Sequence, residues 1–220
     1  MKENIVIIGS SSDLAEEFKN VCLQNNHHVF TVSRKNNSEK NHLCIKDYLE
    51  DSKDIYEFCK NNSNLIVVFF NGFLKENRPL ESPNSFEINQ TDFINFQVPY
   101  NLSLKLNSLT NIKKFVYISS IAAVNPRRKN YIYGLSKFKL EKAVSFINSS
   151  SYLLIRFGKI KTKMSKQHAD PPLTLSKEKA AKILYQKLNN SGIVYGNIGL
   201  MVVGNILKII PRRIILLFNF

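Results

Sequence analysis

The chain has 220 residues, 44% of them hydrophobic, and a formal net charge of +14. This length suits one large α/β domain with a substantial core, and the composition is that of a soluble globular protein. The excess of basic residues predicts an anionic partner, which leaves open a phosphorylated cofactor, an acidic membrane surface or nucleic acid.

Cysteine and histidine content speaks against disulfides and metal sites. The three cysteines, Cys22, Cys44 and Cys59, form no Cys-x-x-Cys pair, and we interpret them as reduced thiols of a cytoplasmic protein. The four histidines show no metal-ligand spacing, so we expect no metal site. The chain enters an apolar run at Ile5, and no secretory signal is expected.

The first expected strand, 4–8, leads into a small, hydroxyl-rich loop and then a helix to about residue 24. Backbone N–H groups and the helix dipole face an anion in such a loop, which makes it a candidate phosphate site. Asp13 would cap the helix but stand close to a pyrophosphate. The candidate cofactor residues of this loop are Gly9, Ser11, Ser12, Asp13 and Leu14.

The second expected strand, 29–32, is followed by Ser33, Arg34 and Lys35. In a dinucleotide fold an acidic residue here would hold the ribose of NAD, whereas an arginine accommodates the 2′-phosphate of NADP. No acidic residue appears before Glu39. We therefore expect Ser33 and Arg34 to favour NADP, the alternative being that the basic residues are solvent-facing loop charges.

A short third strand is expected at 43–45, with Asp47 placed to meet an adenine edge, and a helix at 49–60. The clearest buried strand, 65–70, ends in Asn71 and Gly72, where the backbone can approach a ligand.

A long helical pattern covers 84–109, and Pro99 is expected to kink or split it. Asn89, early in this helix, is a candidate for a buried structural amide or for part of a proton path.

The apolar run 115–118 ends in two serines, and a helix is expected after Tyr131. On that helix Lys137 lies four residues after Tyr133, on the same face. A nearby ammonium favours the phenolate, so we expect Lys137 to lower the pKa of Tyr133. Ser120 lies at the carboxyl end of the strand, the edge at which open α/β sheets bind ligands. Hydroxyl, phenol and cation together suit the reduction of a carbonyl group.

Further strands at 152–155 and 193–195, with a helix at 176–188 between them, complete the alternation. This order predicts βαβ units and a doubly wound, Rossmann-like parallel sheet with helices on both faces, covering residues 1–197.

The C-terminal extension, 198–220, is strongly apolar but carries Lys208, Arg212 and Arg213, and no acidic residue follows Glu178. The interruption at Pro211 makes a spanning helix unsuitable. Two interpretations stay open: an amphipathic helix on an anionic membrane surface, or a helix pair that closes a substrate pocket or an oligomer interface.

Taken together, these motifs resemble the short-chain dehydrogenase/reductase family over most of the chain. The loop at Gly9 stands at the family's glycine-rich loop, and Asn71-Gly72 at its Asn-Asn-Ala-Gly strand end. Ser120, Tyr133 and Lys137 match the catalytic Ser, Tyr and Lys, including the thirteen-residue step from Ser to Tyr. Gly158, Ile160, Thr162 and Met164 resemble the Pro-Gly-x-Ile-x-Thr-x-Met segment, with Phe157 in place of the proline.

The resemblance implies an NADP-dependent oxidoreductase that interconverts a ketone and an alcohol. Tyr133 would then be the general acid/base, with Lys137 lowering its pKa and holding the nicotinamide ribose. Ser120 would hydrogen-bond the developing alkoxide, and Asn89 would belong to the proton relay.

The apolar, basic C-terminal extension also resembles family members that reduce a lipid-linked sugar at the bacterial membrane. That likeness implies a cytoplasmic protein in peripheral contact with the inner face of the membrane. Alternatives are a non-catalytic NADP-binding regulator and an epimerase or dehydratase of nucleotide sugars, although little chain is left for the substrate domain of the latter. Homo-oligomerisation stays open. No interleaved aromatic and basic motif supports nucleic-acid binding.

Overall fold

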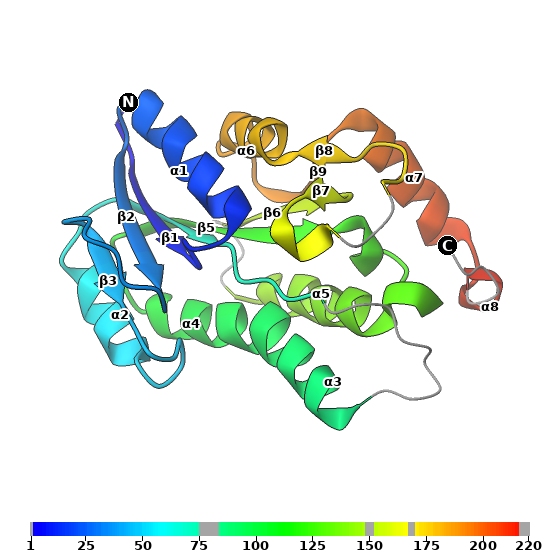
Figure 1. The fold of residues 1–220 in the computed structure, drawn as a ribbon, viewed down its shortest axis with the longest axis horizontal. Coiled ribbons are helices and arrows are strands. Elements are labelled where there is room, and N and C mark those ends of the chain that lie inside the picture. The colour runs from blue at the N-terminus through cyan, green and yellow to red at the C-terminus, as the bar shows by residue number, and fades with distance from the viewer. Residues whose placement is uncertain (1, 75–83, 148–151, 167–169, 216–220) are drawn as a thin grey trace.

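The computed structural model describes residues 2–74, 84–147, 152–166 and 170–215 (Figure 1). The strands are β1 Asn4–Ile8, β2 His28–Ser33, β3 His42–Cys44, β4 Leu65–Phe69, β5 Ile112–Ser120, β6 Tyr152–Phe157, β7 Ile160–Lys161, β8 Leu175–Ser176 and β9 Gly192–Tyr195. The α-helices are α1 Asp13–Gln24, α2 Ser52–Lys60, α3 Ser85–Asp92, α4 Val98–Leu106, α5 Tyr131–Val144, α6 Lys177–Gln186, α7 Ile198–Ile209 and α8 Arg212–Ile215.

Seven of the strands form one parallel sheet in the order β3-β2-β1-β4-β5-β6-β9. Helices α1 and α6 cover one face of the sheet, whereas α2, α4 and α5 cover the other (Figure 1). The central strands are buried on both faces, which is why their sequences read as continuous aliphatic runs: every residue of β4 is buried. The prediction of a doubly wound, Rossmann-like parallel sheet is confirmed.

The direction of winding reverses at β1. The chain moves outward from β1 to β2 and β3, then returns to the other side of β1 to add β4, β5, β6 and β9. In open α/β sheets, ligands bind beyond the carboxyl ends of the strands at such a reversal. The loops after β1 and β4 therefore face the expected binding site.

The helical region before β5 departs from a single long α-helix. Between α3 and α4 the chain widens into a π-helical segment, Phe93–Gln97, and Pro99 lies in the first turn of α4. Proline has no N–H to donate to the carbonyl oxygen of Asn95, four residues earlier. The predicted break at Pro99 thus takes the form of a π-helical widening just before it, a local geometry often found at functional sites.

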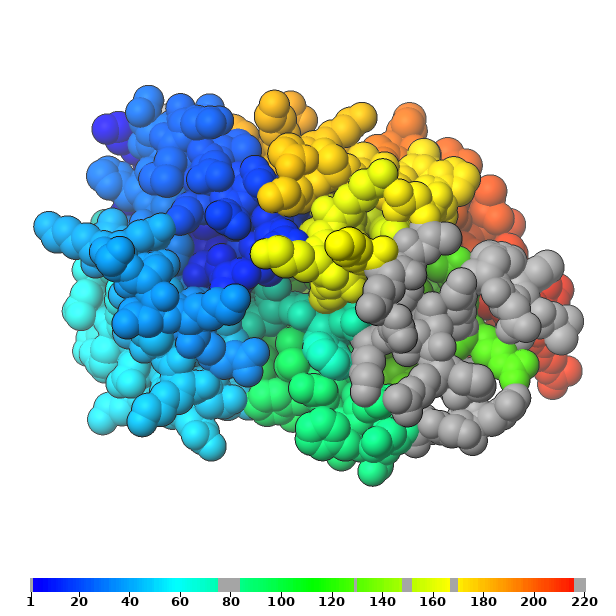
Figure 2. Space-filling view, in the orientation of Figure 1, coloured from blue at the N-terminus to red at the C-terminus, as the bar shows by residue number. Residues whose placement is uncertain are grey.

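The C-terminal part of the described chain consists of α7 and α8, on the right-hand edge of the molecule in Figure 2. Helix α7 buries only a narrow stripe, Leu200 and Gly204, and leaves most of its apolar side chains exposed. Within the described ranges, none of the helices has the length and apolar character needed to cross a bilayer.

Candidate active site

The loop after β1 has the backbone geometry of a phosphate cradle. Gly9 has φ +84°, and a Cβ there would lie 3.1 Å from the backbone of both Phe70 and Asn71, so only glycine fits. The Ser12 hydroxyl caps α1 by accepting a hydrogen bond from Ala15 N at 3.2 Å. Ser11 is exposed beside it, and Leu14 turns into the core. The loop residues present therefore fit a bound pyrophosphate at the N-terminus of α1.

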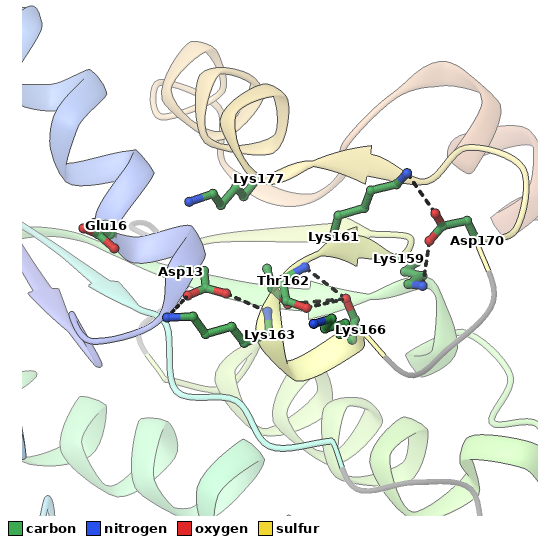
Figure 3. Close-up of a pocket in the computed structure, with 10 residues that line it drawn as sticks. Asp13, Glu16, Lys159, Lys161, Thr162, Lys163, Lys166, Asp170 and Lys177 are labelled. Atoms are coloured by element: carbon green, nitrogen blue, oxygen red, sulfur yellow. Dashed lines mark hydrogen bonds and ion pairs between the residues drawn. The ribbon is translucent and has the colours of Figure 1, made fainter.

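Asp13 is turned away from the loop, toward the segment after β7. Its carboxylate accepts a hydrogen bond from Lys163 N at 2.6 Å, and the Lys163 ammonium lies 3.7 Å away (Figure 3). The negative charge of Asp13, which was expected to be unfavourable beside a pyrophosphate, is thus paired with the backbone N–H and the ammonium of Lys163. The same contact ties the N-terminus of α1 to the segment that follows β7.

Two exposed basic residues, Arg34 and Lys35, follow the end of β2. Ser33 is buried, and its hydroxyl donates to Lys35 O at 2.8 Å, which fixes the turn. The Arg34 guanidinium is exposed over the ring of Tyr48, 5.9 Å from its centroid. Asp47 accepts hydrogen bonds from Leu49 N and Glu50 N, which occupies one of its carboxylate oxygens in the turn before α2.

Beyond β4, Asn71 carries an unsatisfied acceptor. Its side chain is buried, yet its Oδ1 atom has no hydrogen-bond partner among the described residues. A buried orphan acceptor is costly unless a ligand or water satisfies it. Gly72 follows, with Met164 Cε and Asn95 Oδ1 each 3.9 Å from where its Cβ would be. Both features fit a ligand lying across the ends of β1 and β4.

Ser120 and Tyr133 are brought into hydrogen-bond contact. Ser120 ends β5 and caps the 3₁₀ turn Ile121–Ala123 through Ala122 N, at 3.2 Å. Helix α5 can lie against this turn because residue 134 is glycine, whose Cβ would otherwise meet Ala122 O at 2.8 Å. Burial raises the pKa of the Tyr133 phenol to about 12, while the hydrogen bond to Ser120 pulls the pKa down.

Lys137 lies one turn after Tyr133 and is only 3% exposed. Its ammonium donates to the carbonyl oxygens of Ile118, at 3.0 Å, and Asn71, at 3.4 Å. Burial lowers the pKa of Lys137 to about 8, and the charge of Glu141 opposes that fall. The expectation that the cation would bring the pKa of Tyr133 below its ordinary value is therefore wrong, because loss of solvation has the larger effect on the phenol.

Asn89 is not placed in this cluster. It is exposed on α3, so its interpretation as a buried amide is wrong. The buried amide of the region is Asn95, in the π-helical segment, which is fully buried. Its side chain exchanges two hydrogen bonds with the backbone of Phe73, at 3.1 and 2.7 Å, and donates a third to Thr91 O. Asn95 thus fixes the backbone beyond β4 beside Gly72.

The segment after β6 borders the same edge of the sheet. Phe157, in place of the family's proline, is a core residue of β6, and Gly158 packs against Leu200 of α7. Ile160 lies in the small β7–β8 sheet. Thr162 heads a 3₁₀ turn and lines a cavity of about 610 Å³ with Asp13. Figure 3 draws the remaining lining side chains as well, which are Glu16, Lys159, Lys161, Lys163, Ser165, Lys166, Asp170 and Lys177.

Comparisons with known proteins define the fold. No family model matches the chain, and no curated protein sequence matches it. Solved structures do match. A short-chain dehydrogenase from Burkholderia cenocepacia J2315, in complex with NADP, has a TM-score of 0.82 at 14% identity over 94% of this chain and 93% of that one. ElxO with NADP bound has a TM-score of 0.74 at 19% identity over 92% and 100%. A 4-hydroxyisoleucine dehydrogenase complexed with NADH has a TM-score of 0.68 at 16% identity over 89% and 98%.

The chain therefore has the fold of the short-chain dehydrogenases/reductases, as the motifs indicated. The fold brings Ser120, Tyr133 and Lys137 to one strand edge, with Asn71 beside them. The amide that sequence reasoning missed, Asn95, could have been found from helical phase. It precedes the core residues Val98 and Leu102 by three and seven positions and so lies on their stripe.

The low pKa of Lys137 predicts a specific pH dependence of stability. Its pKa is lowered in the folded protein, so between pH 8 and 10.5 the unfolded chain binds more protons than the native one. The contribution of Lys137 to the free energy of unfolding should therefore rise between pH 8 and 10.5 and be constant below pH 8. In denaturant unfolding, the free energy of unfolding of the wild type should rise by roughly 3 kcal/mol relative to that of Lys137→Met between pH 8 and 10.5. A constant difference would mean that the amine titrates normally.

Proposed function

We propose that this protein is an NADP-dependent oxidoreductase that interconverts a ketone and an alcohol. The observation that carries the proposal is the hydrogen-bonded pair Ser120–Tyr133 with the buried cation Lys137 one helical turn away. All three lie at the carboxyl edge of the sheet, beside the phosphate-type loop at Gly9 and the orphan acceptor of Asn71. Similar structures bind NADP or NADH.

The protonation state of Tyr133 suits carbonyl reduction. A phenol whose pKa lies near 12 is protonated at neutral pH, the form that can give a proton to an oxygen becoming an alkoxide. Ser120 can offer its hydroxyl hydrogen to the same oxygen as negative charge develops there. The bound nicotinamide would supply the hydride.

Lys137 has two functions in this scheme. Its positive charge, a helical turn from Tyr133, stabilises the phenolate left after proton transfer. Its remaining hydrogen-bonding capacity can hold a hydroxyl of the nicotinamide ribose. Since two of its three donors meet backbone carbonyls, the direction of the third is fixed by the strands rather than by a flexible chain.

Tyr133→Phe should keep cofactor binding and remove turnover. The change deletes the transferable proton but little volume, so NADPH affinity should stay within about twofold while the rate falls at least roughly 100-fold. NADPH binding by fluorescence and NADPH oxidation with a ketone panel measure the two effects. Tyr131→Phe, on the same helix, is the matched control. A near wild-type rate in Tyr133→Phe would refute the mechanism.

A non-catalytic NADP-binding regulator is the alternative, motivated by Asp13 in the phosphate loop and by Phe157. It requires no hydride transfer, so transfer of label from [4-²H]NADPH to a ketone separates the two functions. An epimerase or dehydratase of nucleotide sugars is a further alternative.

The preference for NADP over NAD rests on Arg34. Its guanidinium is exposed beside Tyr48, where an adenine ribose phosphate would meet a cation rather than a carboxylate. The fold by itself does not decide the preference, because similar structures carry either cofactor.

Arg34→Asp should invert this preference. A charge-assisted hydrogen bond is worth about 1.5–3 kcal/mol, so NADPH binding should weaken by roughly tenfold to 100-fold, whereas NADH binding should stay or improve. Calorimetric titration of both cofactors measures this. Lys60→Asp makes the same change of charge at the C-terminal end of α2 and should alter neither affinity. Equal losses for both cofactors would place the phosphate elsewhere.

For the substrate we propose a sugar carried on a lipid, met by a cytoplasmic protein at the inner face of the membrane. The support is α7. Ile198, Val202, Ile206 and Ile209 are exposed by 77, 52, 49 and 80%, and their spacing puts them on one side of the helix. Basic residues, Lys208, Arg212 and Arg213, follow in the last turn of α7 and in α8, and no acidic residue occurs after Glu178. An exposed aliphatic stripe flanked by cations suits an anionic lipid surface.

Replacing Val202, Ile206 and Ile209 with serine should abolish binding to vesicles. Flotation with phosphatidylglycerol/phosphatidylcholine vesicles should recover the wild type and leave the triple variant in the aqueous fraction, with neutral vesicles binding neither. The control triple variant Leu23→Ser, Phe86→Ser, Phe146→Ser removes exposed apolar side chains elsewhere and should still bind. Unchanged flotation of the α7 variant would contradict the proposal, and a wild-type dimer that it dissociates would identify α7 as a subunit interface.

A further inference from the structure

A row of polar side chains, buried at its centre and half-buried at Tyr195, crosses the sheet beneath α5. Ser119, Arg156 and Tyr195 are register partners on the neighbouring strands β5, β6 and β9. Glu141 of α5 lies over the row. Its carboxylate accepts hydrogen bonds from the Ser119 hydroxyl at 2.7 Å and from Arg156 Nε and Nη2 at 2.9 and 2.5 Å. Arg156 Nη1 donates to the Tyr195 hydroxyl at 2.8 Å.

The ion pair of Glu141 and Arg156 differs from the aliphatic and aromatic core around it, and it is not a simple source of stability. Glu141 is 4% and Arg156 8% exposed, and burying two charges costs about as much as their attraction returns. The proposed chemistry uses neither side chain. Their position is specific, however: Glu141 follows Lys137 by four residues, as Lys137 follows Tyr133, so the three share one face of α5.

Lys137 has no other carboxylate close to it among the described residues. Its hydrogen-bond acceptors are the neutral carbonyl groups of Ile118 and Asn71. The polar groups of this region are Tyr133 and Glu141 on α5, Ser120 beside Tyr133 and Ser119 and Arg156 beside Glu141. After β4 lies Asn71, whose side chain is hydrogen-bonded to Tyr48. Glu141 is thus the charge that offsets the burial of the amine.

We infer that Glu141 is a positioning residue: its carboxylate, fixed by Ser119 and Arg156, keeps the Lys137 amine protonated beside Tyr133. The inference rests on the proposed function, in which that cation stabilises the Tyr133 phenolate and holds the nicotinamide ribose. Ser119 and Arg156 act by holding the carboxylate still, and neither touches the reacting groups.

The test is a direct titration of Lys137. Protein labelled with [ε-¹³C]lysine is titrated by NMR, and the Lys137 signal is assigned from its loss in Lys137→Arg. In the wild type the midpoint should lie near pH 8. Glu141→Gln should lower it by about one unit, the scale on which one nearby opposite charge acts. Ser119→Ala, which removes one hydrogen bond to Glu141 but no charge, should lower the midpoint by less than Glu141→Gln does.

A second variant covers the case in which Glu141→Gln does not fold. The double replacement Glu141→Met/Arg156→Met exchanges the buried pair for apolar side chains, a change that buried ion pairs often tolerate. If Glu141 served packing alone, this variant would regain wild-type NADPH affinity and the wild-type midpoint of Lys137. We expect a lowered midpoint and weaker NADPH binding at pH 8 than at pH 6.5.

An unchanged Lys137 midpoint in either folded variant would overturn the inference. This outcome is separate from failure of the proposed function, because the NMR titration needs neither substrate nor turnover. A lowered midpoint in a protein that transfers no hydride would leave Glu141 as the group that sets the charge of Lys137 and would remove only the oxidoreductase proposal.

Discussion

The buried amine of Lys137 is the constraint around which the candidate site is built. To keep a cation in a nearly dry position, the fold must bring carbonyl oxygens to it, and those of Ile118 and Asn71 come from the ends of two adjacent strands. Helix α5 must therefore approach β5 closely, which Gly134 allows. That approach also delivers Tyr133 to Ser120, so one requirement for solvating a charge fixes the geometry of all three groups.

Polar burial is concentrated at this edge of the sheet, whereas the layers behind it are aliphatic and aromatic. Asn95 secures the backbone after β4, and Glu141 with Arg156 secures the charge beneath α5. These groups reduce the apolar packing available at the edge. Each of them, however, holds a backbone segment or a side chain of the site in one orientation. Such restriction is expected where a site is preorganised rather than formed on binding. Asn71 Oδ1, which has no hydrogen-bond partner among the described residues, is the exception, and it fits a ligand bound at this edge.

Sequence reasoning reached the fold because parallel strands such as β4 are apolar on both faces and leave an unmistakable run. It paired Tyr133 with Lys137 because helical spacing is independent of tertiary context. It failed where tertiary context decides. Asn89 precedes Val98 by nine residues, about two and a half turns, which puts it opposite the core stripe. The direction in which the pKa of Tyr133 shifts depends on how far the phenol is removed from water, which the sequence does not show. The strands β7 and β8 have two residues each, too few to show an alternation of apolar and polar residues.

The contacts of helix α7 are compatible with both interpretations of the C-terminal extension, as a helix that packs near the site and as a helix on a membrane surface. Its buried stripe packs Gly204 against Tyr195 and Leu200 against Gly158, so the helix touches both the outer end of the polar row and the segment after β6. Asn125, in the loop before α5, donates to the carbonyl oxygens of Leu207 and Ile210. The aliphatic stripe through Val202 and Ile206 is not needed for these contacts. One helix can therefore brace the loop that leads to Tyr133 with one side and expose the other to the lipid surface that we propose. Under that proposal, a substrate held in the surface would reach the protein at the helix that braces the candidate site.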